Sequence, residues 1–227
     1  MQVVILAAGR GTRMKNLTDE IPKPMLKIKN KPILEHKLNA LPDEIDEIIF
    51  VVGYRRGKIE EYFGDNFNGK KIIYVLQENL NGTGGAVHLV KDLVKDKFLV
   101  MMGDDLYHRE DIKNILKYDN AILACETDNP SQFGVFKIDG SGHLLEIVEK
   151  PVNPPSNLIN TGLYVLTKDF FKYDLIPISE TEFGLPQTLV KMAQDFPVKI
   201  VKTDRWQPIG NPEDLERAEK ILEKFLD

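Results

Sequence analysis

The stretch that decides the fold is VVILAAGRGTRM, at residues 3–14. It begins with the apolar run Val3–Leu6 and passes directly into Ala7, Ala8, two glycines and two arginines. A short run of β-branched character is typical of a buried strand, and small residues after it let backbone amides approach an anion. The sequence therefore predicts a first strand that ends in a phosphate-binding loop.

The glycine loop admits two interpretations. It lacks the third glycine of the dinucleotide fingerprint and the Gly-Lys-Ser/Thr of a P-loop, so a turn at Gly9 and Gly11 that serves only packing is the alternative. Two cations in the polar segment that follows, Arg13 and Lys23, favour the phosphate interpretation, because fixed positive charge beside a glycine-rich loop suits polyanions.

The rest of the first half alternates strands and helices. Further apolar runs of strand length lie at Glu47–Val52, Lys71–Leu76 and Phe98–Met102, and segments with helical spacing lie at Pro32–Leu41, Lys58–Phe63 and Ala86–Val94. Such alternation predicts a Rossmann-like α/β fold with a mostly parallel sheet and helices on both faces.

In the second half the regular alternation of strands and helices ends. Gly134–Ile138 and His143–Val148 flank a turn signal at residues 139–142, which predicts an antiparallel insert. A further strand is expected at Asn157–Leu166, a helix at Leu185–Ala193, and a last helix with Asn211 as its N-cap. Because no repeat, low-complexity tract or linker occurs, we expect one domain over residues 1–227.

Two loops carry polar side chains suited to ligand binding. Asp104 follows the strand predicted at Phe98–Met102, and open α/β sheets bind ligands at the carboxyl ends of their strands. Its carboxylate is a candidate ligand for Mg²⁺, with a solvated acidic turn as the alternative. Gln77 precedes a glycine-rich stretch that begins at Gly82, and its amide can donate and accept at once, as recognition of a nucleobase requires.

Composition excludes several classes of protein. The chain has 227 residues, 42% hydrophobic and 29% charged, which predicts a folded globular protein. A net charge of −5 with dispersed Lys and Arg argues against nucleic-acid and anionic-membrane binding. The apolar runs are far shorter than a membrane span, and no secretory leader follows Met1, so we expect a cytoplasmic protein. The single cysteine, Cys125, rules out a disulfide within the chain and a thiolate metal cage.

Taken together, the motifs resemble those of the sugar-1-phosphate nucleotidyltransferases, or nucleotide-sugar pyrophosphorylases, of the glucose-1-phosphate thymidylyltransferase and uridylyltransferase kind. The resemblance spans almost the whole chain. The segments that carry it are Leu6–Met14, Pro22–Pro24, Gly82–Thr83, Gly103–Asp104, Phe133–Val135, Glu149–Pro151, Asn160–Gly162 and Trp206–Pro212. The family fold, a nucleotide-binding α/β core with an inserted sugar-binding portion, agrees with the predicted elements.

The resemblance implies Mg²⁺-dependent transfer of a nucleotidyl group from a nucleoside triphosphate to a sugar 1-phosphate. It implies that Arg13 holds the leaving β and γ phosphates, that Lys23 bridges the sugar phosphate and the α-phosphate, and that Asp104 binds Mg²⁺. Residues implied to bind the nucleotide are Leu6, Ala7, Ala8, Gly9, Gly11, Thr12, Gln77, Gly82 and Thr83. Those implied to surround the sugar and its phosphate are Gly134, Glu149, Lys150, Asn160 and Thr161. Each could instead have a purely structural role, Gly134 and Thr161 most of all.

The substrates are less well specified. The Gln77 amide favours UTP or dTTP, because one amide can satisfy the imide edge of a pyrimidine. The Gly82–Ala86 stretch also resembles that of members that use GTP or CTP with mannose- or heptose-type phosphates. A homo-oligomer is compatible with the resemblance, since relatives often assemble.

The chain departs from the family pattern at Pro208. Many relatives have a second metal-binding carboxylate at this point of the Trp-x-Asp-Ile-Gly segment, which here is Trp206–Gly210. Either Asp104, phosphates and water hold the metal, or Asp105, Asp204 or Gln207 assists, or activity is weakened. Many relatives also carry a C-terminal repeat domain, whereas this sequence ends after one capped helix, so we expect no second activity.

Two other classes stay open. A non-catalytic nucleotide- or sugar-binding regulator would account for Pro208. A glycosyltransferase would use Gly103–Asp105 as an acidic metal motif, but it leaves Arg13 and Lys23 unexplained.

Overall fold

The structure is a computed structural model that describes residues 1–225. The strands are β1 (Gln2–Ala7), β2 (Lys27–Ile28), β3 (Lys31–Pro32), β4 (Glu47–Val52), β5 (Asn66–Phe67), β6 (Lys70–Leu76), β7 (Lys97–Met102), β8 (Leu106–Tyr107), β9 (Ala121–Glu126), β10 (Gly134–Ile138), β11 (Leu144–Glu149), β12 (Leu158–Thr167), β13 (Ile176–Pro177), β14 (Phe183–Gly184), β15 (Lys199–Thr203) and β16 (Trp206–Gln207). The helices are α1 (Ile33–Asn39), α2 (Gly57–Phe63), α3 (Gly82–His88), α4 (Arg109–Ile115), α5 (Leu185–Met192) and α6 (Pro212–Ile221). Five 3₁₀ helices are η1 (Thr12–Thr18), η2 (Lys23–Met25), η3 (Pro130–Gln132), η4 (Lys168–Lys172) and η5 (Leu222–Phe225).

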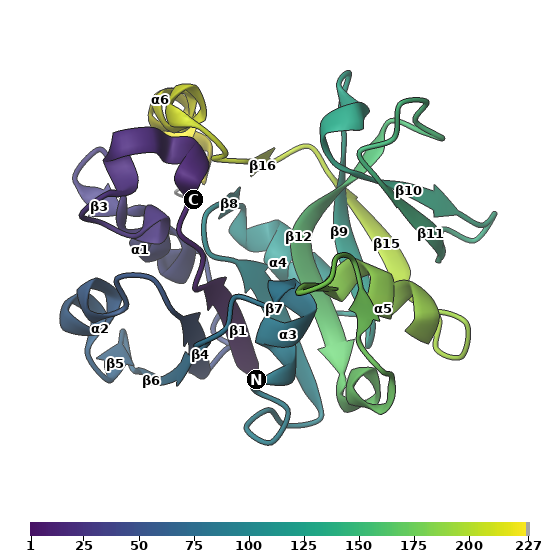
Figure 1. Ribbon diagram of the computed structural model, residues 1–227, viewed down its shortest axis with the longest axis horizontal. Helices are drawn as coiled ribbons and strands as arrows, with labels where there is room; N and C mark the ends of the chain where they lie inside the picture. The colour runs from purple at the N-terminus through teal and green to yellow at the C-terminus, as the bar shows by residue number, and fades with distance from the viewer. Residues whose placement is uncertain (226–227) are drawn as a thin grey trace.

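The strands of the first half form the parallel part of a ten-stranded sheet (Figure 1). Strand β1 lies at its centre and pairs in parallel with β4 and β7, and β4 pairs in parallel with β6. All four strands predicted for the first half are confirmed within one residue at each end. Their carboxyl ends therefore meet at one edge of the sheet, where Ala8, Gln77 and Gly103 follow β1, β6 and β7.

The second half adds antiparallel strands, as predicted. Strand β12 pairs in the antiparallel sense with β7, β9 and β10, and β10 pairs with β11 as a hairpin. No bounds were predicted for α4, β9 or β15. Strand β15 has two consecutive apolar residues, Ile200 and Val201, between Lys199 and Lys202. It becomes a strand of the sheet through its parallel pairing with β9.

Helices cover both faces of the sheet, which confirms the predicted fold class. On one face Val3 and Ile5 pack with Leu34 of α1, Ile59 of α2 and Ile112 of α4. On the other face Val4 packs with side chains of α3 and α5. The alternation follows from strand geometry, because successive side chains point to opposite faces.

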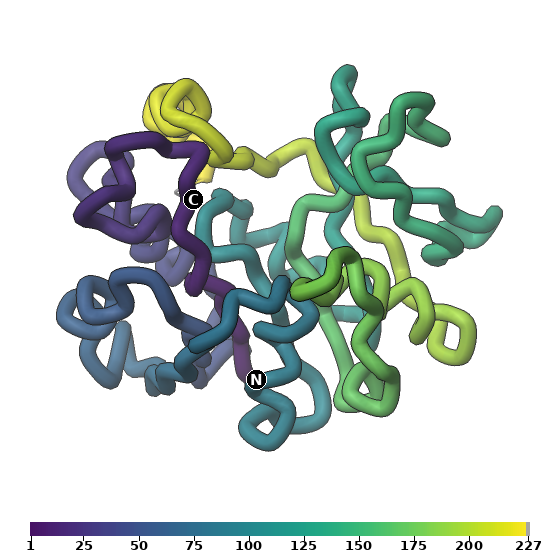
Figure 2. The backbone as a smooth tube through the Cα atoms, viewed as in Figure 1, coloured from purple at the N-terminus to yellow at the C-terminus, as the bar shows by residue number. Residues whose placement is uncertain are grey.

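A third apolar cluster joins the two ends of the described chain. Ala218 and Leu222 pack with Met14 and Ile28, so the last helix lies against the segment that follows the glycine loop. Figure 2 shows this return of the C-terminal segment to the N-terminal part. The Oδ1 atom of Asn211 accepts a hydrogen bond from the Asp214 amide at 2.8 Å, which confirms the predicted N-cap.

Helix α3 differs from the predicted Ala86–Val94. It begins at Gly82, so the glycine-rich stretch forms its first turn, and after His88 the backbone continues in turns such as the Leu93 amide to Val90 carbonyl bond. Within residues 1–225, no helix combines the length and apolar character that crossing a bilayer requires.

Candidate active site

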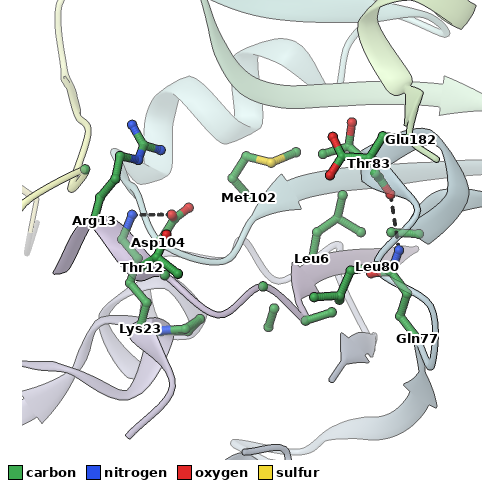
Figure 3. A pocket seen from close by; sticks show the side chains of 18 of the residues that line it. Leu6, Thr12, Arg13, Lys23, Gln77, Leu80, Thr83, Met102, Asp104 and Glu182 are labelled. Atoms are coloured by element: carbon green, nitrogen blue, oxygen red, sulfur yellow. Dashed lines mark hydrogen bonds and ion pairs between the residues drawn. The ribbon is translucent and has the colours of Figure 1, made fainter. Parts of the chain in front are cut away.

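A cavity of about 520 Å³ opens at the carboxyl ends of β1, β6 and β7. Figure 3 shows Arg13, Lys23 and Asp104 on one side of it and Gln77 on the other. All twelve residues predicted to act in catalysis, nucleotide binding or metal binding line it: Leu6, Ala7, Ala8, Gly9, Gly11, Thr12, Arg13, Lys23, Gln77, Gly82, Thr83 and Asp104. The tertiary structure thus brings together residues up to 98 positions apart, Leu6 and Asp104 being the extremes.

Close backbone approach shapes the glycine loop. Gly11 has φ +67°, and a Cβ placed on it would lie 2.8 Å from Cβ of Lys23. The Thr18 hydroxyl donates to the Gly11 carbonyl at 3.1 Å, which holds the start of η1. Gly11 is therefore required for two reasons, its left-handed backbone and the proximity of Lys23.

Lys23 and Asp104, which both line the cavity, form an ion pair. Nζ of Lys23 lies 2.5 Å from Oδ2 of Asp104, and the side chains are 8% and 32% exposed. Arg13 lies nearby on η1, and no carboxylate of residues 1–225 pairs with it. The cavity thus presents one neutralised and one free cation, an arrangement suited to a polyanion.

A second buried ammonium lies behind the Asp104 turn. Lys37 is 1% exposed, donates to the Asp105 carbonyl oxygen and lies 4.4 Å from the centroid of the Tyr107 ring. Burial lowers the pKa of Lys37, and burial followed by the charge of Asp104 raises the pKa of Asp105. Two ammonium groups thus accompany the two carboxyl groups of this turn.

The opposite end of the cavity is built around Gln77, which is 6% exposed. Its Nε2 donates to the Asn81 Oδ1 at 2.9 Å and to the Gly82 carbonyl at 3.2 Å. A carbonyl can only accept, so the contact with Gly82 fixes which end of the Gln77 amide is nitrogen. Both amide hydrogens are then used, which corrects the expectation that this amide donates and accepts at once toward a base. The atom left for a ligand is Oε1, to which no group within residues 1–225 donates.

The β13–β14 segment supports this end of the cavity. The Phe183 amide donates to the Asn81 carbonyl at 2.9 Å, and the Leu185 amide donates to Oγ1 of Thr83 at 3.1 Å. Gly82 has φ +86°, and a Cβ there would lie 2.4 Å from the Phe183 carbonyl oxygen. The Gly82 loop is therefore fixed by residues about 100 positions later.

Several residues that line the cavity were not assigned to the site from sequence. They are Pro24, Leu80, Ala86, Met102, Ile178, Glu182 and Gly210. Ile178 and Glu182 belong to a segment without any motif, so nothing in the sequence pointed to them. Their position depends on the pairing of that segment with the Gly82 loop.

The residues predicted to bind the sugar lie outside this cavity. Gly134 pairs with Glu149 across β10 and β11, and a Cβ on Gly134 would lie 2.9 Å from Oε1 of Glu149. The Lys150 amide donates to the Phe133 carbonyl at 2.9 Å. These three residues therefore lie together at the end of the hairpin.

Asn160 and Thr161 lie on β12 and use their side chains within the protein. Nδ2 of Asn160 donates to the Tyr164 hydroxyl at 2.7 Å, and its Oδ1 accepts from the Gly162 amide at 2.9 Å. Thr161 is 1% exposed, and its hydroxyl donates to the Leu123 carbonyl at 2.8 Å. The pairing of Val135 with Ile159 places Gly134 and Asn160 on adjacent strands.

The candidates for a second metal-binding group do not line the cavity. The Asp204 side chain is 98% exposed, and Nε2 of Gln207 donates to the Pro208 carbonyl at 2.6 Å. Asp105 accepts hydrogen bonds from Nε1 of Trp206 and the Ile209 amide, both at 3.3 Å. Among residues 1–225, the carboxylates that line the cavity belong to Asp104 and Glu182.

A family model for nucleotidyl transferases matches residues 2–224. The chain belongs to this nucleotidyl transferase family. It is 39% identical over 225 residues to the bifunctional protein GlmU of Methanocaldococcus jannaschii, covering 98% of this chain and 54% of that protein. The chain thus spans about half the length of that relative.

Two further similarities cover both proteins almost fully. This nucleotidyl transferase chain is 32% identical over 236 residues to the UTP–glucose-1-phosphate uridylyltransferase AglF of Haloferax volcanii, covering 99% and 97% of the two chains. It superimposes with a TM-score of 0.87 and 25% identity on a structure described as a glucose-1-phosphate thymidylyltransferase of Bacillus anthracis, covering 97% and 94%.

Proposed function

We propose that this chain transfers a nucleotidyl group from a nucleoside triphosphate to a sugar 1-phosphate and releases pyrophosphate. The observation that carries the proposal is the cavity itself, where a glycine loop, the Lys23–Asp104 pair and Arg13 lie opposite the Gln77 amide. A triphosphate at the glycine loop and a base at Gln77 would fill its two ends. The names of AglF and of the Bacillus anthracis protein support the same reaction class.

The reaction requires alignment more than acid–base chemistry. An oxygen of the sugar phosphate attacks the α-phosphorus, a P–O bond forms there, and the bond from the α-phosphorus to the bridging oxygen of pyrophosphate breaks with its electron pair on the leaving group. The nucleophile is already an anion near neutral pH, so no strong general base is needed. Because the C1–O bond of the sugar stays intact, the anomeric configuration is retained.

Fixed cations reduce the repulsion between the two polyanions. Lys23 bridges the sugar phosphate and the α-phosphate, and Arg13, which is free of carboxylates in the described chain, holds the β and γ phosphates. Positively charged groups placed before the reaction stabilise developing charge without reorganisation.

Mg²⁺ fits at Asp104. This carboxylate lines the cavity, and Mg²⁺ is commonly held by one or two carboxylates together with substrate phosphates and water. Within residues 1–225 no three His, Cys, Asp or Glu side chains gather into a metal site of their own. Of the arrangements left open at Pro208, we therefore favour Asp104 with phosphates and water. When bound, the ion supplies positive charge to the phosphates of the substrate.

The hydrogen bonds of Gln77 favour UTP or dTTP. With both Nε2 hydrogens donated to Asn81 and Gly82, the amide offers the base an acceptor, Oε1. With Oε1 facing the ring nitrogen of the base edge, N3–H of uracil or thymine donates to it, whereas N3 of cytosine and N1 of adenine are acceptors and would face it without a hydrogen. Guanine, which also donates from N1, is the runner-up. For the sugar we propose glucose or N-acetylglucosamine 1-phosphate, with a mannose- or heptose-type phosphate as the alternative.

Pyrophosphate release tests the function directly. UTP, dTTP, CTP, GTP and ATP are each incubated with Mg²⁺ and a panel of sugar 1-phosphates, with controls that lack the sugar. We expect sugar-dependent release that is highest with UTP or dTTP. Nucleotide binding without release from any pair would contradict the proposal and support a nucleotide-binding regulator.

The metal assignment has its own test. Asp104→Asn should lower Mg²⁺-dependent turnover about 100-fold or more, because it removes the one carboxylate that we assign to the ion. Asp204→Asn is the matched control, since this exposed side chain lies outside the cavity. Unchanged Mg²⁺ dependence in Asp104→Asn would disprove the assignment.

A further inference from the structure

The segment 203–210 crosses back over the turn that carries Asp104. Strand β16 pairs with β8, with Trp206 opposite Tyr107 and Gln207 opposite Leu106. This pairing brings residues from near the end of the chain to within reach of the residue that follows Asp104.

Asp105 holds that segment through hydrogen bonds on both sides of Pro208. One carboxylate oxygen, Oδ2, accepts from Nε1 of Trp206, and the other, Oδ1, accepts from the amide of Ile209, each at 3.3 Å. Pro208 has no amide hydrogen, so it cannot contribute a backbone donor of its own. The carboxylate of Asp105 therefore supplies a link between the Asp104 turn and residues 206–209.

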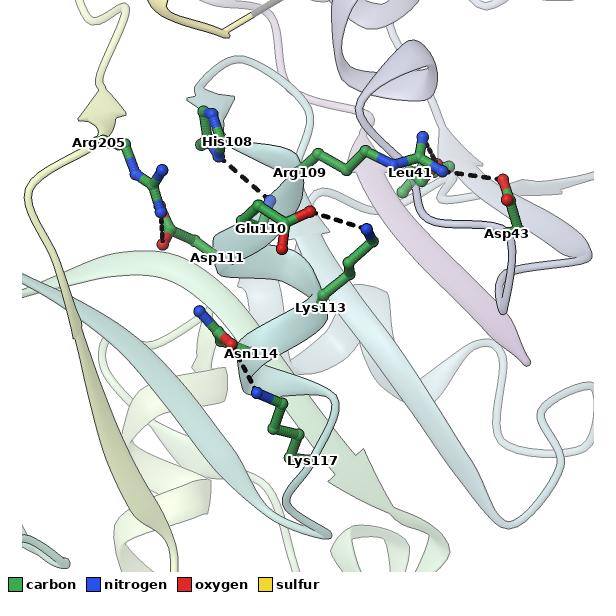
Figure 4. A network of polar contacts seen from close by, with 10 residues as sticks. All are labelled: Leu41, Asp43, His108, Arg109, Glu110, Asp111, Lys113, Asn114, Lys117 and Arg205. Atoms are coloured by element: carbon green, nitrogen blue, oxygen red, sulfur yellow. Dashed lines mark hydrogen bonds and ion pairs between the residues drawn. The ribbon is translucent and has the colours of Figure 1, made fainter. Parts of the chain in front are cut away.

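A second carboxylate holds the same segment farther upstream. Asp111, at the start of α4, accepts from the Thr203 hydroxyl and from Nη2 of Arg205, both at 2.7 Å. Figure 4 shows the contact between Asp111 and Arg205. This contact joins β15 to α4, away from the cavity. Of the two carboxylates, only Asp105 acts next to the candidate active site.

The segment forms the wall beside Arg13. Gly210 lines the cavity, its amide donates to Oδ2 of Asp214 at 2.9 Å, and a Cβ on Gly210 would lie 3.8 Å from Nη1 of Arg13. Any shift of residues 206–210 therefore changes the space around the Arg13 guanidinium.

We propose that Asp105 is a positioning residue. Its hydrogen bonds hold residues 206–210 in place beside Arg13 in the free protein, before a substrate or metal binds. It acts through the segment and touches neither substrate nor metal. The kinetic consequence rests on the proposed function, whereas the structural consequence does not.

The single tryptophan of the chain, Trp206, reports the structural consequence. Acrylamide quenching of its fluorescence is measured in the free protein with EDTA and again with Mg²⁺. Asp105→Ala should raise the quenching constant about twofold, because the indole N–H loses its hydrogen-bond partner. Asp105→Asn should give an intermediate quenching constant, because the two donors contact different carboxylate oxygens and an amide keeps an acceptor at only one of those two positions. Asp204→Ala, two residues before Trp206, is the matched control and should match the unmodified protein.

Kinetics report the functional consequence. We expect Asp105→Ala to lower kcat about tenfold with a change below threefold in KM for the triphosphate, because Arg13 is misplaced while the base end is unchanged. Trp206→Phe removes the N–H donor but keeps an aromatic ring against Phe133, 5.7 Å away between centroids. Its effect on kcat should be less than additive with that of Asp105→Ala, as expected for groups that share one hydrogen bond.

Two results would overturn the proposal. One is equal Trp206 quenching in Asp105→Ala and the unmodified protein. The other is that Trp206 in the unmodified protein is protected from acrylamide quenching only when Mg²⁺ is present. The metal, and not Asp105, would then hold the segment in place. If Asp105→Ala does not fold, the proposal is tested with Asp105→Asn and Trp206→Phe. Additive effects of these two substitutions on kcat would then contradict it. Because quenching needs no turnover, failure of the proposed reaction would not be mistaken for failure of this inference.

Discussion

The residues proposed to bind the nucleotide, here called the nucleotide side, and those proposed to bind the sugar, here called the sugar side, occupy different kinds of position in the fold. On the nucleotide side, residues after β1, β6 and β7 all line one cavity. On the sugar side, Asn160 and Thr161 lie on an antiparallel strand and direct their polar atoms to Tyr164, Gly162 and Leu123. Parallel strands bring their carboxyl ends to one edge of the sheet, whereas the side chains of Asn160 and Thr161 have hydrogen-bond partners within the protein.

Burial alone does not separate the two sides. Lys23 is 6% exposed and Thr161 is 1% exposed. Lys23 nevertheless lines the cavity with its ammonium group, while the Thr161 hydroxyl is bonded to a backbone carbonyl in the core. The direction of the polar atom and its partner decide which residue is free to meet a ligand.

Loss of the Lys23 ammonium should have the largest effect. Lys23→Ala removes a cation from between the two phosphates and should lower kcat about 1,000-fold, as for other preorganised charges. Pyrophosphate release under saturating substrates measures it. Lys27→Ala, an exposed lysine four positions later, is the control. A loss below tenfold would mean that the nucleotide side does not work through this ion pair.

Gly82→Ala should damage the nucleotide side through the backbone. Its φ of +86° and the 2.4 Å approach to the Phe183 carbonyl both exclude a Cβ, so we expect a loss of about 3 kcal/mol in the free energy of unfolding. Chemical denaturation measures it. Gly140→Ala has nothing within 4 Å of the added Cβ and should change stability little. Equal stability of the two variants would show that the Gly82 loop is not held by β14.

Gln77→Leu tests the base end. The variant loses the Oε1 acceptor and leaves the Gly82 carbonyl without its side-chain donor, so kcat/KM for UTP should fall about 30-fold. Steady-state kinetics with UTP and CTP measure it, and the preference between the two should shrink. The exposed Gln194→Leu serves as control. An unchanged preference would remove Gln77 from base selection.

Thr161→Val should have the smallest effect on substrate binding. It leaves the buried Leu123 carbonyl without its hydroxyl donor and should cost about 1 kcal/mol of stability, with KM for the sugar phosphate changed less than twofold. Glu149→Gln, on the hairpin beside Gly134, is the companion that should raise that KM. A tenfold rise in KM for Thr161→Val without a loss of stability would show that the Thr161 hydroxyl meets the substrate, as the residues that line the cavity are proposed to do.

The fold was predictable where local pattern and burial agree. The run Glu47–Val52 is buried on both faces of the sheet, and its predicted bounds are those of β4. Strand β15 was missed because its apolar run, Ile200 and Val201, has only two residues between Lys199 and Lys202, and its strand character depends on pairing with β9. Glu182 was missed for a similar reason, since only pairing with the Gly82 loop brings its segment to the cavity.

The sequence by itself determined the chemistry of the cavity and its place at the ends of parallel strands. A buried strand, a glycine loop, two cations and a carboxylate after a later strand follow from residue type and order, because these are local properties. Only the tertiary structure decided that Lys23 pairs with Asp104, that Gln77 presents an acceptor, and that Asp105 holds the Trp206 segment. These are contacts between groups 4 to 101 residues apart, and hydrogen bonds of that kind depend on ångström distances that residue order does not encode locally.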